Sequence, residues 1–230
     1  QMRPQISGMV EVAEATRQAS RTSPSADRAS QSGMLFCSGQ AFWQKGTPQS
    51  VQRFDKLLQA ADVIICQLEV PAETVAWALA RGRELGKCVI LNPAPATGPL
   101  PAAWFAHIDY LTPNESEAEA LTGIAVSDQG SALRAGERLL QLGAGKVIIT
   151  LGAQGALLVT EQGHRHFPAP SVQPLDTTAA GDTFIGGFAA ALVRGLEEGE
   201  AIALGQRAAA LSVTRAGAQP SIPYLAELQP

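Results

Sequence analysis

Short apolar runs alternate with amphipathic stretches from about residue 50 onward. Runs rich in β-branched residues predict buried strands, because such side chains favour extended backbone. Apolar residues that recur every three or four positions predict helices between these runs. The predicted strands cover 62–69, 87–92, 109–114 and 146–152, with a hairpin over 155–170, and the predicted helices cover 50–61, 71–86, 116–123, 131–143, 180–195 and 197–217.

This order of elements predicts an α/β fold. Strand–helix–strand units connect by right-handed crossovers, so we expect a doubly wound, mostly parallel sheet with helices on both faces. The ligand site of such a sheet lies beyond the carboxyl ends of its strands. Glu69, Asn92, Asn114 and Gly152 stand at or just beyond the ends of predicted strands and are therefore candidate site residues.

Residues 1–49 differ from the rest of the chain. The segment 18–33 is rich in Ser, Arg and Ala and has no large aliphatic residue, and the segment 34–46 is apolar without a period. A segment of this kind buries too little apolar surface to offset the entropy lost on ordering. We therefore expect a poorly ordered leader over 1–49 and one α/β domain over 50–230.

Composition excludes several classes of protein. A net charge of −4 disfavours a protein whose main task is to bind nucleic acid or an anionic membrane. The apolar runs are too short to cross a bilayer. Three cysteines without a CxxC spacing disfavour a disulfide framework or a zinc site and favour the cytoplasm. We expect Cys66 and Cys88 in the core, and His164 and His166 at the surface.

The segment 175–188 combines the features that carry chemistry. Three small residues, Ala179, Ala180 and Gly181, lead directly into an apolar helix, whose first N–H groups and dipole attract an anion. Asp182 adds a carboxylate in the first turn of that helix. The alternative is that Asp182 and Thr183 only cap the helix.

The string DTTAAGDTF over 176–184 closely resembles the second signature of the ribokinase-like (PfkB) family of sugar and nucleoside kinases. Further segments resemble the same family in the same order: 67–71, 91–96, 111–123, 149–158 and 214–223. The first signature of the family, a GGKGAN-like string, and its early sugar-binding segment have no counterpart here. We therefore expect a ribokinase-like fold that is truncated at its amino terminus.

The resemblance implies ATP-dependent phosphorylation of D-ribose to D-ribose 5-phosphate, with Mg²⁺ and K⁺ as further cofactors. It makes Asp182 the base that accepts the proton of the sugar hydroxyl, and Glu69 a second sugar contact. It makes Ala179, Ala180 and Gly181 an anion hole for the transferring phosphoryl group. We expect a carboxylate at a helix amino terminus to be a weak base, which a loose transition state tolerates.

The nucleotide site that the resemblance implies comprises Asn114, Thr150, Leu151, Gly152, Ala153, Gln154, Gly155, Gly181, Asp182 and Gln206. Glu117 would hold Mg²⁺ through water, because Mg²⁺ keeps much of its hydration. The structural alternative is that Asn114 caps a helix with Glu117 facing solvent. In the same way, Gly152 and Gly155 could be turn glycines only, and Gln206 a solvated helix residue. No GxxxxGK[ST] loop occurs, which disfavours a P-loop NTPase.

The monovalent-cation site that the resemblance implies comprises Asp176, Thr178, Ser212, Arg215, Gly217 and Ser221, mostly through carbonyl oxygens. Such an oxygen-rich cage suits a hard, weakly hydrated cation such as K⁺ better than zinc. The alternative is a loop that Asp176 merely caps.

Two other functions stay open on the sequence. The chain could phosphorylate another sugar or a nucleoside, or it could be a catalytically defective fragment that only binds nucleotide. The expected partners are a small sugar and ATP, with no nucleic acid and no membrane. The resemblance also implies a homodimer formed through a lid. Without that lid we expect the dimer interface to be absent and an exposed apolar sheet edge to favour aggregation.

Overall fold

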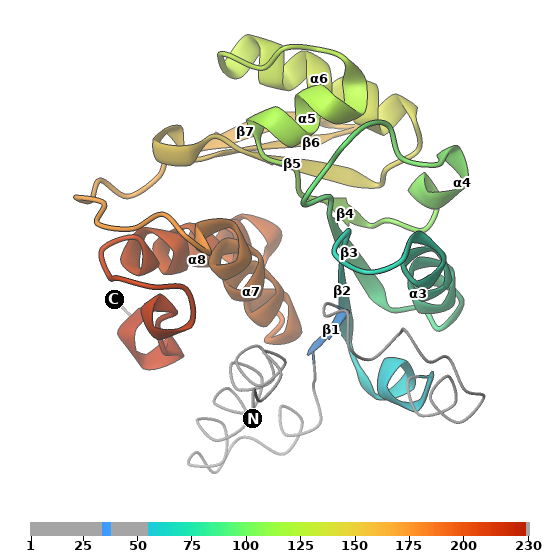
Figure 1. Ribbon diagram of the computed structural model, residues 1–230, viewed down its shortest axis with the longest axis horizontal. Coiled ribbons are helices and arrows are strands. Elements are labelled where there is room, and N and C mark those ends of the chain that lie inside the picture. Colours follow the sequence, from blue (N-terminus) through green and yellow to red (C-terminus); the bar gives the residue numbers. More distant parts are fainter. Residues whose placement is uncertain (1–33, 38–54, 229–230) are drawn as a thin grey trace.

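Strands and helices alternate along the chain, as the hydrophobic pattern predicts. The computed structural model describes residues 34–37 and 55–228 (Figure 1). In chain order its elements are β1 (Met34–Cys37), a helix over 55–60, β2 (Val63–Gln67), α3 (Ala72–Glu84), β3 (Cys88–Asn92), α4 (Ala102–Phe105), β4 (Tyr110–Leu111), α5 (Glu115–Thr122), α6 (Gln129–Gln141), β5 (Lys146–Thr150), η2 (Gly152–Gln154), β6 (Ala156–Thr160), β7 (Gly163–Phe167), α7 (Ala180–Val193), α8 (Glu198–Ser212), η3 (Gln219–Ser221) and η4 (Leu225–Leu228).

All seven of these strands belong to one sheet, in which they follow one another in chain order. β1 to β5 run parallel, while β6 and β7 pair antiparallel as the predicted hairpin. Right-handed crossovers between strands in sequential order place their helices on a single face. Figure 1 shows α3 to α6 on that face and the pair α7 and α8 on the other. The predicted α/β class with helices on both faces is confirmed.

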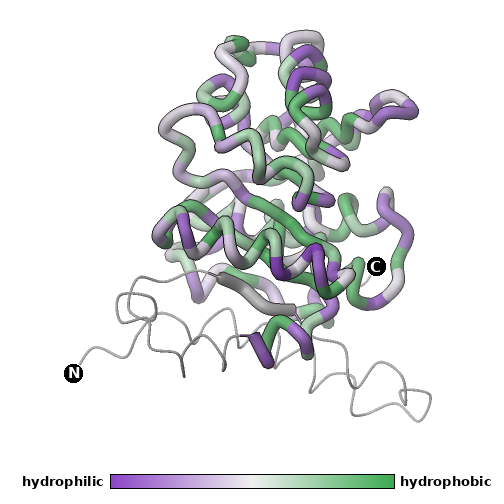
Figure 2. Tube along the Cα trace, turned by 90° about the vertical axis from the view of Figure 1, so that its right-hand side faces the viewer, coloured by the Kyte–Doolittle hydropathy of each residue, from purple (hydrophilic) through white to green (hydrophobic). Residues whose placement is uncertain are grey.

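Two hydrophobic cores fill the two sides of the sheet. Ile64 and Cys66 of β2 belong to the cluster under α3 to α6, and Val63 and Ile65 belong to the cluster under α7 and α8. This division follows from the two-residue period of a strand. Because both faces are covered, β2, β3 and β5 are mostly apolar, and Figure 2 shows hydrophobic stretches of chain in the interior of the molecule.

The amino-terminal segment differs in part from its prediction. Met34–Cys37 forms β1 and pairs in parallel with β2, so this piece of the expected leader is a strand of the sheet. The rest of the leader prediction, and the proposed helix start at Ser50, lie outside the described residues. Apolar residues without a period are ambiguous between a buried strand and a loop, which is why the pattern missed β1.

One helix was missed further along the chain, and several element boundaries differ from the predicted ones, most of all the end of α8. α4 was not predicted, because the proline-rich segment before it reads as a loop, although Pro101 stands at its N-cap. α8 ends at Ser212, before the predicted Gly217. The carbonyl oxygen of Val213, directly after this helix, accepts the N–H groups of Leu175 and Asp176. The end of α8 therefore coincides with a tertiary contact, which the periodicity of apolar residues in the helix cannot predict.

The predicted roles of the cysteine and histidine side chains agree with the structure where it describes them. Cys66 is fully buried, Cys88 is half-buried and both thiols are free. His164 is exposed, and His166 lies partly exposed on the same strand. Within the described part of the chain, no helix combines the length and the hydropathy that a bilayer crossing requires.

Helices α7 and α8 approach each other closely at two glycines. A Cβ atom added at Gly187 would lie 3.0 Å from the Cα of Gly205, and one added at Gly205 would lie 2.7 Å from the carbonyl oxygen of Phe184. Only glycine permits this separation of the two backbones. The contact fixes the position of α7 on the sheet, and with it the position of the first turn of α7.

Gly205→Ala should therefore destabilise the protein. Overpacking costs about 1–3 kcal/mol and outweighs the gain of up to about 1 kcal/mol in helix propensity. Gly186→Ala is the matched control on α7, since its added Cβ would meet no atom within 4 Å. Urea unfolding should show a lower free energy of unfolding for Gly205→Ala and an equal or higher one for Gly186→Ala. Equal free energies for the two variants would contradict the close contact.

Candidate functional site

The turn that begins α7 carries an unusual backbone conformation. Ala179, the N-cap residue, is left-handed with φ of +62°, a conformation that a non-glycine residue adopts at a cost of about 1–2 kcal/mol. The N–H and the hydroxyl of Thr183 both donate to the Ala179 carbonyl oxygen, at 2.9 and 2.8 Å, and hold the turn in place. Strain of this kind is retained where the surrounding structure fixes it and is often part of a functional site.

The first amides of α7 point out of the helix. Ala180 donates its N–H to the carbonyl oxygen of Thr177, whereas Gly181 and Asp182 have no acceptor inside the helix. No side chain caps this terminus, so the capping alternative for Asp182 and Thr183 is wrong. Successive N–H groups after a left-handed residue form a concave anion-binding surface, and the helix dipole adds positive potential. The arrangement is suited to bind a phosphate group.

The Asp182 carboxylate lies beside these amides, at the carboxyl end of β2. The side-chain amide of Gln67 donates to its Oδ1 atom at 2.8 Å. Burial raises the pKa of Asp182 above its ordinary value, and the hydrogen bond from Gln67 opposes that shift only in part. The expectation of a base weakened by the helix terminus is therefore wrong in direction. Asp182 is suited to accept a proton.

Asn114 and Glu117 form a capping box at the start of α5. The Asn114 side chain accepts the N–H of Glu117 at 2.8 Å, and the Glu117 carboxylate accepts the N–H of Asn114 at 2.9 Å. The alternative of a capping Asn114 is thus present, but Glu117 is half-buried and does not simply face solvent. Burial raises the pKa of Glu117, the hydrogen bond from Asn114 lowers it, and the charge of Asp182 raises it further. Glu117 and Asp182 therefore face a common region.

The turn after β5 lies next to this capping box, since Asn114 and Thr150 form a parallel bridge. The N–H of Leu151 donates to the carbonyl oxygen of Gly155 and closes the turn around η2. Gly155 has φ of +102°, and a Cβ atom there would lie 2.0 Å from the Phe167 carbonyl oxygen, so it is a required turn glycine. Three residues of this turn are exposed and available to a ligand: Gly152, Ala153 and Gln154.

Gln206 of α8 lies beneath this turn. It is 7% exposed, and its amide donates to the Phe167 carbonyl oxygen at 2.7 Å. The alternative of a solvated helix residue is therefore wrong. Gln206 holds the end of β7 beside Gly155, which leaves the rest of its amide for a further contact.

Asp176 joins the turn before α7 to the loop after α8. Its two carboxylate oxygens accept the N–H groups of Thr178 and Gly217, each at 2.9 Å. Hydrogen bonds from Thr178 and from the Gly217 backbone lower the pKa of Asp176, so the group stays ionised. Asp176 thus caps the loop, as the structural alternative states. The same hydrogen bonds bring together three predicted cation ligands: Asp176, Thr178 and Gly217.

The side chains of the other predicted cation ligands are engaged elsewhere. The Ser212 and Ser221 hydroxyls donate to the carbonyl oxygens of Ala209 and Ala218, and Arg215 forms an ion pair with Glu227. The two hydroxyl oxygens keep lone pairs that could bind a cation, since each hydroxyl only donates in these bonds. The cage of mostly carbonyl oxygens stays a prediction. In the part of the chain that the structure describes, no three His, Cys, Asp or Glu side chains form a metal cluster.

The sequence analysis gave Gln67 no role, although it contacts the candidate base. Gln67 is 4% exposed, whereas the predicted sugar contact Glu69 is exposed just beyond the end of β2. The signal available in the sequence was a polar residue that closes a fully apolar strand at its carboxyl end. Its partner lies 115 positions further along the chain, so the pairing itself has no local signature.

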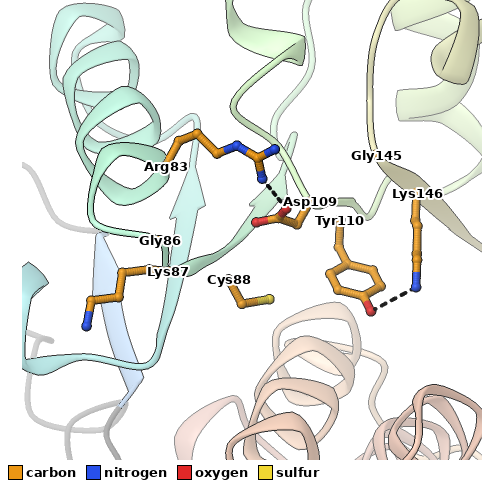
Figure 3. Close-up of a pocket in the computed structure, with 8 residues that line it drawn as sticks. All are labelled: Arg83, Gly86, Lys87, Cys88, Asp109, Tyr110, Gly145 and Lys146. Carbon is orange, nitrogen blue, oxygen red and sulfur yellow. Dashed lines mark hydrogen bonds and ion pairs between the residues drawn. The ribbon is translucent and has the colours of Figure 1, made fainter.

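A cavity of about 520 Å³ lies at the opposite edge of the sheet, where β3, β4 and β5 begin (Figure 3). Its cations are already paired: Arg83 with Asp109 at 2.8 Å, Lys146 with Glu198, and Lys87 with a main-chain carbonyl oxygen. Burial raises the pKa of Cys88 to about 12. The thiol of Cys88 is therefore protonated at neutral pH, and this cavity offers no group for catalysis comparable to Asp182.

Two curated ribokinases are similar to this chain in sequence. Ribokinase from Haemophilus influenzae is 44% identical over 173 residues, which cover 75% of this chain and 56% of that protein. Ribokinase from Staphylococcus aureus is 40% identical over 183 residues, which cover 79% and 60% respectively. The chain thus spans less than two thirds of the length of these curated relatives.

Solved structures show the same fold. Ribokinase from Thermotoga maritima superimposes with a TM-score of 0.69 at 42% identity, over 76% of this chain and 57% of that one. Arabidopsis thaliana ribokinase complexed with ribose and ATP gives 0.74 at 30% identity, over the same shares. The model of the pfkB family carbohydrate kinases matches residues 10–225, which extends into the segment 1–49 that the sequence analysis set apart. Since this match covers most of the chain, the protein belongs to the pfkB family of carbohydrate kinases.

Proposed function

We propose that this chain transfers the terminal phosphoryl group of ATP to the primary hydroxyl of D-ribose, which gives D-ribose 5-phosphate. One observation carries the proposal: the outward-pointing amides of Gly181 and Asp182 lie beside a half-buried carboxylate whose pKa is raised. Two features support ribose as the sugar. The curated relatives at 40–44% identity are ribokinases, and one related structure is complexed with ribose and ATP.

In the proposed mechanism Asp182 orients the sugar hydroxyl and accepts its proton as the phosphoryl group transfers. A base with a raised pKa accepts this proton more readily than an ordinary aspartate, at a pH where it is still ionised. The free amides of Gly181 and Asp182 stabilise the negative charge on the phosphoryl oxygens, whereas the N–H of Ala180, a predicted donor, is already bonded to the Thr177 carbonyl oxygen. Because the left-handed turn at Ala179 is fixed in advance, these donors need no reorganisation during the reaction.

The same edge of the sheet supplies the proposed ATP site. Asn114 at the N-cap of α5 and the turn from Thr150 to Gly155 would hold the nucleotide. Gln206 supports that turn from α8. The parallel bridge between Asn114 and Thr150 supports a single continuous site. Glu69, exposed just past the end of β2, is the proposed second sugar contact.

The residues present fit a magnesium ion. Burial is the main cause of the raised pKa of Glu117, and the charge of Asp182 adds to it, so the two carboxylates repel each other. A divalent cation relieves this repulsion. We propose that Glu117 holds Mg²⁺ through water, since the carboxylate is already hydrogen-bonded to the Asn114 amide. When bound, Mg²⁺ neutralises charge on the phosphate oxygens.

The residues present also fit a monovalent cation. The ionised Asp176 lies at one end of the turn that leads to Ala179, and main-chain oxygens of Ser212, Arg215 and Ser221 belong to the facing loop. We propose that K⁺ binds there, with Thr178 and Gly217 as further ligands. When bound, K⁺ adds positive potential beside the anion hole.

The free thiols of Cys66 and Cys88 support a reducing compartment such as the cytoplasm.

A coupled assay of ADP release with ribose tests the proposal, and Asp182→Asn is the decisive variant. The substitution keeps the shape of the side chain but removes the base, so kcat should fall by at least about 100-fold. Asp128→Asn is the matched control, because Asp128 caps α6 away from the site and asparagine caps equally well. It should leave kcat unchanged.

Two outcomes would contradict the proposal. Turnover that survives in Asp182→Asn would remove Asp182 from the mechanism. Binding of ATP with no phosphorylation of any sugar by the unmodified chain would leave only a nucleotide-binding fragment. A panel that includes 2-deoxyribose separates the sugars, since a deoxyribokinase from Salmonella typhi is 37% identical over 179 residues. Ribose should give the higher kcat/KM.

Asp176→Asn should weaken activation by K⁺. The variant loses the charge that attracts the cation, so the K⁺ concentration for half-maximal activity should rise severalfold, with KM for ribose little changed. A titration of activity with KCl at constant ionic strength measures this. The control is Glu227→Gln, which removes a carboxylate from the Arg215 ion pair nearby but leaves Asp176 in place. Equal KCl midpoints in Asp176→Asn and the unmodified chain would refute the proposed site.

A further inference from the structure

We infer that Gln67 is a positioning residue for the proposed base: it holds Oδ1 of Asp182 and leaves Oδ2 as the oxygen that meets the sugar hydroxyl. This inference deepens the proposed function and rests on it for the role of Asp182. Gln67 touches neither sugar nor nucleotide in this account. It acts only through Asp182.

The alternation of β2 shows that Gln67 stands at a position the core would otherwise fill. Val63 and Ile65 point to the side of α7 and α8, and Gln67 is the next residue with the same orientation. It is nonetheless an amide, and it is 4% exposed. A buried amide without a partner is costly, so its hydrogen bond must be satisfied at that place. The partner is Asp182, which enters from the first turn of α7.

The geometry divides the two oxygens of the carboxylate. The amide of Gln67 lies 2.8 Å from Oδ1. Among the residues that the structure describes, no protein donor is bonded to Oδ2. A carboxylate held by one oxygen on a rigid strand keeps its second oxygen in a defined direction. The amide is also neutral, so it fixes the carboxylate without the charge that a lysine or arginine would add.

The hydrogen bond from Gln67 also affects the pKa of Asp182. Donation from Gln67 lowers the pKa of Asp182 against the larger effect of burial. Gln67 therefore keeps a half-buried base ionised toward lower pH. A residue that only filled the core beside Asp182 would raise this pKa through burial, whereas the hydrogen bond from Gln67 lowers it.

Carboxyl ¹³C NMR on the chain labelled with [γ-¹³C]aspartate tests the inference, with the Asp182 resonance assigned through Asp182→Asn. Gln67→Met continues the apolar stripe of β2 and fills a similar volume, so the variant should fold. It should shift the Asp182 titration midpoint to higher pH. Gln67→Glu should shift it further, because two carboxylates within hydrogen-bond distance share one proton.

Gln206→Met is the matched control. It also removes a buried amide, but that amide is bonded to the Phe167 carbonyl oxygen and not to Asp182, so the Asp182 midpoint should stay where it is. An unchanged midpoint in both Gln67 variants would overturn the inference, as would an equal shift in Gln206→Met. The experiment involves no phosphoryl transfer. A chain without kinase activity would therefore refute the proposed function, whereas the hydrogen bond from Gln67 to Asp182 is tested only by the Asp182 titration midpoints.

Discussion

The first turn of α7 depends on the packing that holds that helix against the sheet. Gly187 and Gly205 let α7 and α8 approach closely, and Thr183 fixes the left-handed Ala179 through two hydrogen bonds to one carbonyl oxygen. Together these contacts direct the free amides of the turn toward the carboxyl edge of the sheet. The strained residue is thus maintained both by helix packing in the core and by hydrogen bonds within the turn itself.

Groups that attract an anion and groups that attract a cation lie close together at the carboxyl edge of the sheet. The amides of α7 attract an anion, while Glu117 and Asp182 are two carboxylates that repel each other and have raised pKa values. A bound phosphate alone would worsen the repulsion, and a bound cation alone would leave the amides without an acceptor. A nucleotide phosphate together with a divalent cation satisfies both groups. The proposed reaction therefore matches the charge arrangement of the site and does not rest on family membership alone.

Local patterns predicted the elements of the described sheet well, because a strand buried on both faces must be continuously apolar. They also located the turn before α7, where small residues precede a helix. They failed where the cause is not local. β1 lies in an apolar segment without a period and is recognisable only through its pairing with β2. α8 is shorter than predicted, and it ends where Val213 contacts the turn before α7.

The site was predictable to the extent that each residue carried its own signal. Asp182 lies in the string 176–184 and Asn114 in the segment 111–123. Both segments resemble the family and occur in the same order as in the family. The direction of the Asp182 pKa was not predictable, since it depends on how deeply the tertiary structure buries the carboxyl. Gln67 was missed for a related reason: its function is a hydrogen bond across 115 positions, and a single glutamine at a strand end does not reveal its partner.

The most direct test of the central claim is a crystal structure of the chain with a non-hydrolysable ATP analogue. The account predicts that oxygens of the terminal phosphate lie within hydrogen-bond distance of the main-chain nitrogens of Gly181 and Asp182, about 2.7–3.2 Å. A terminal phosphate bound elsewhere on the sheet edge, with these two nitrogens left to solvent, would contradict it.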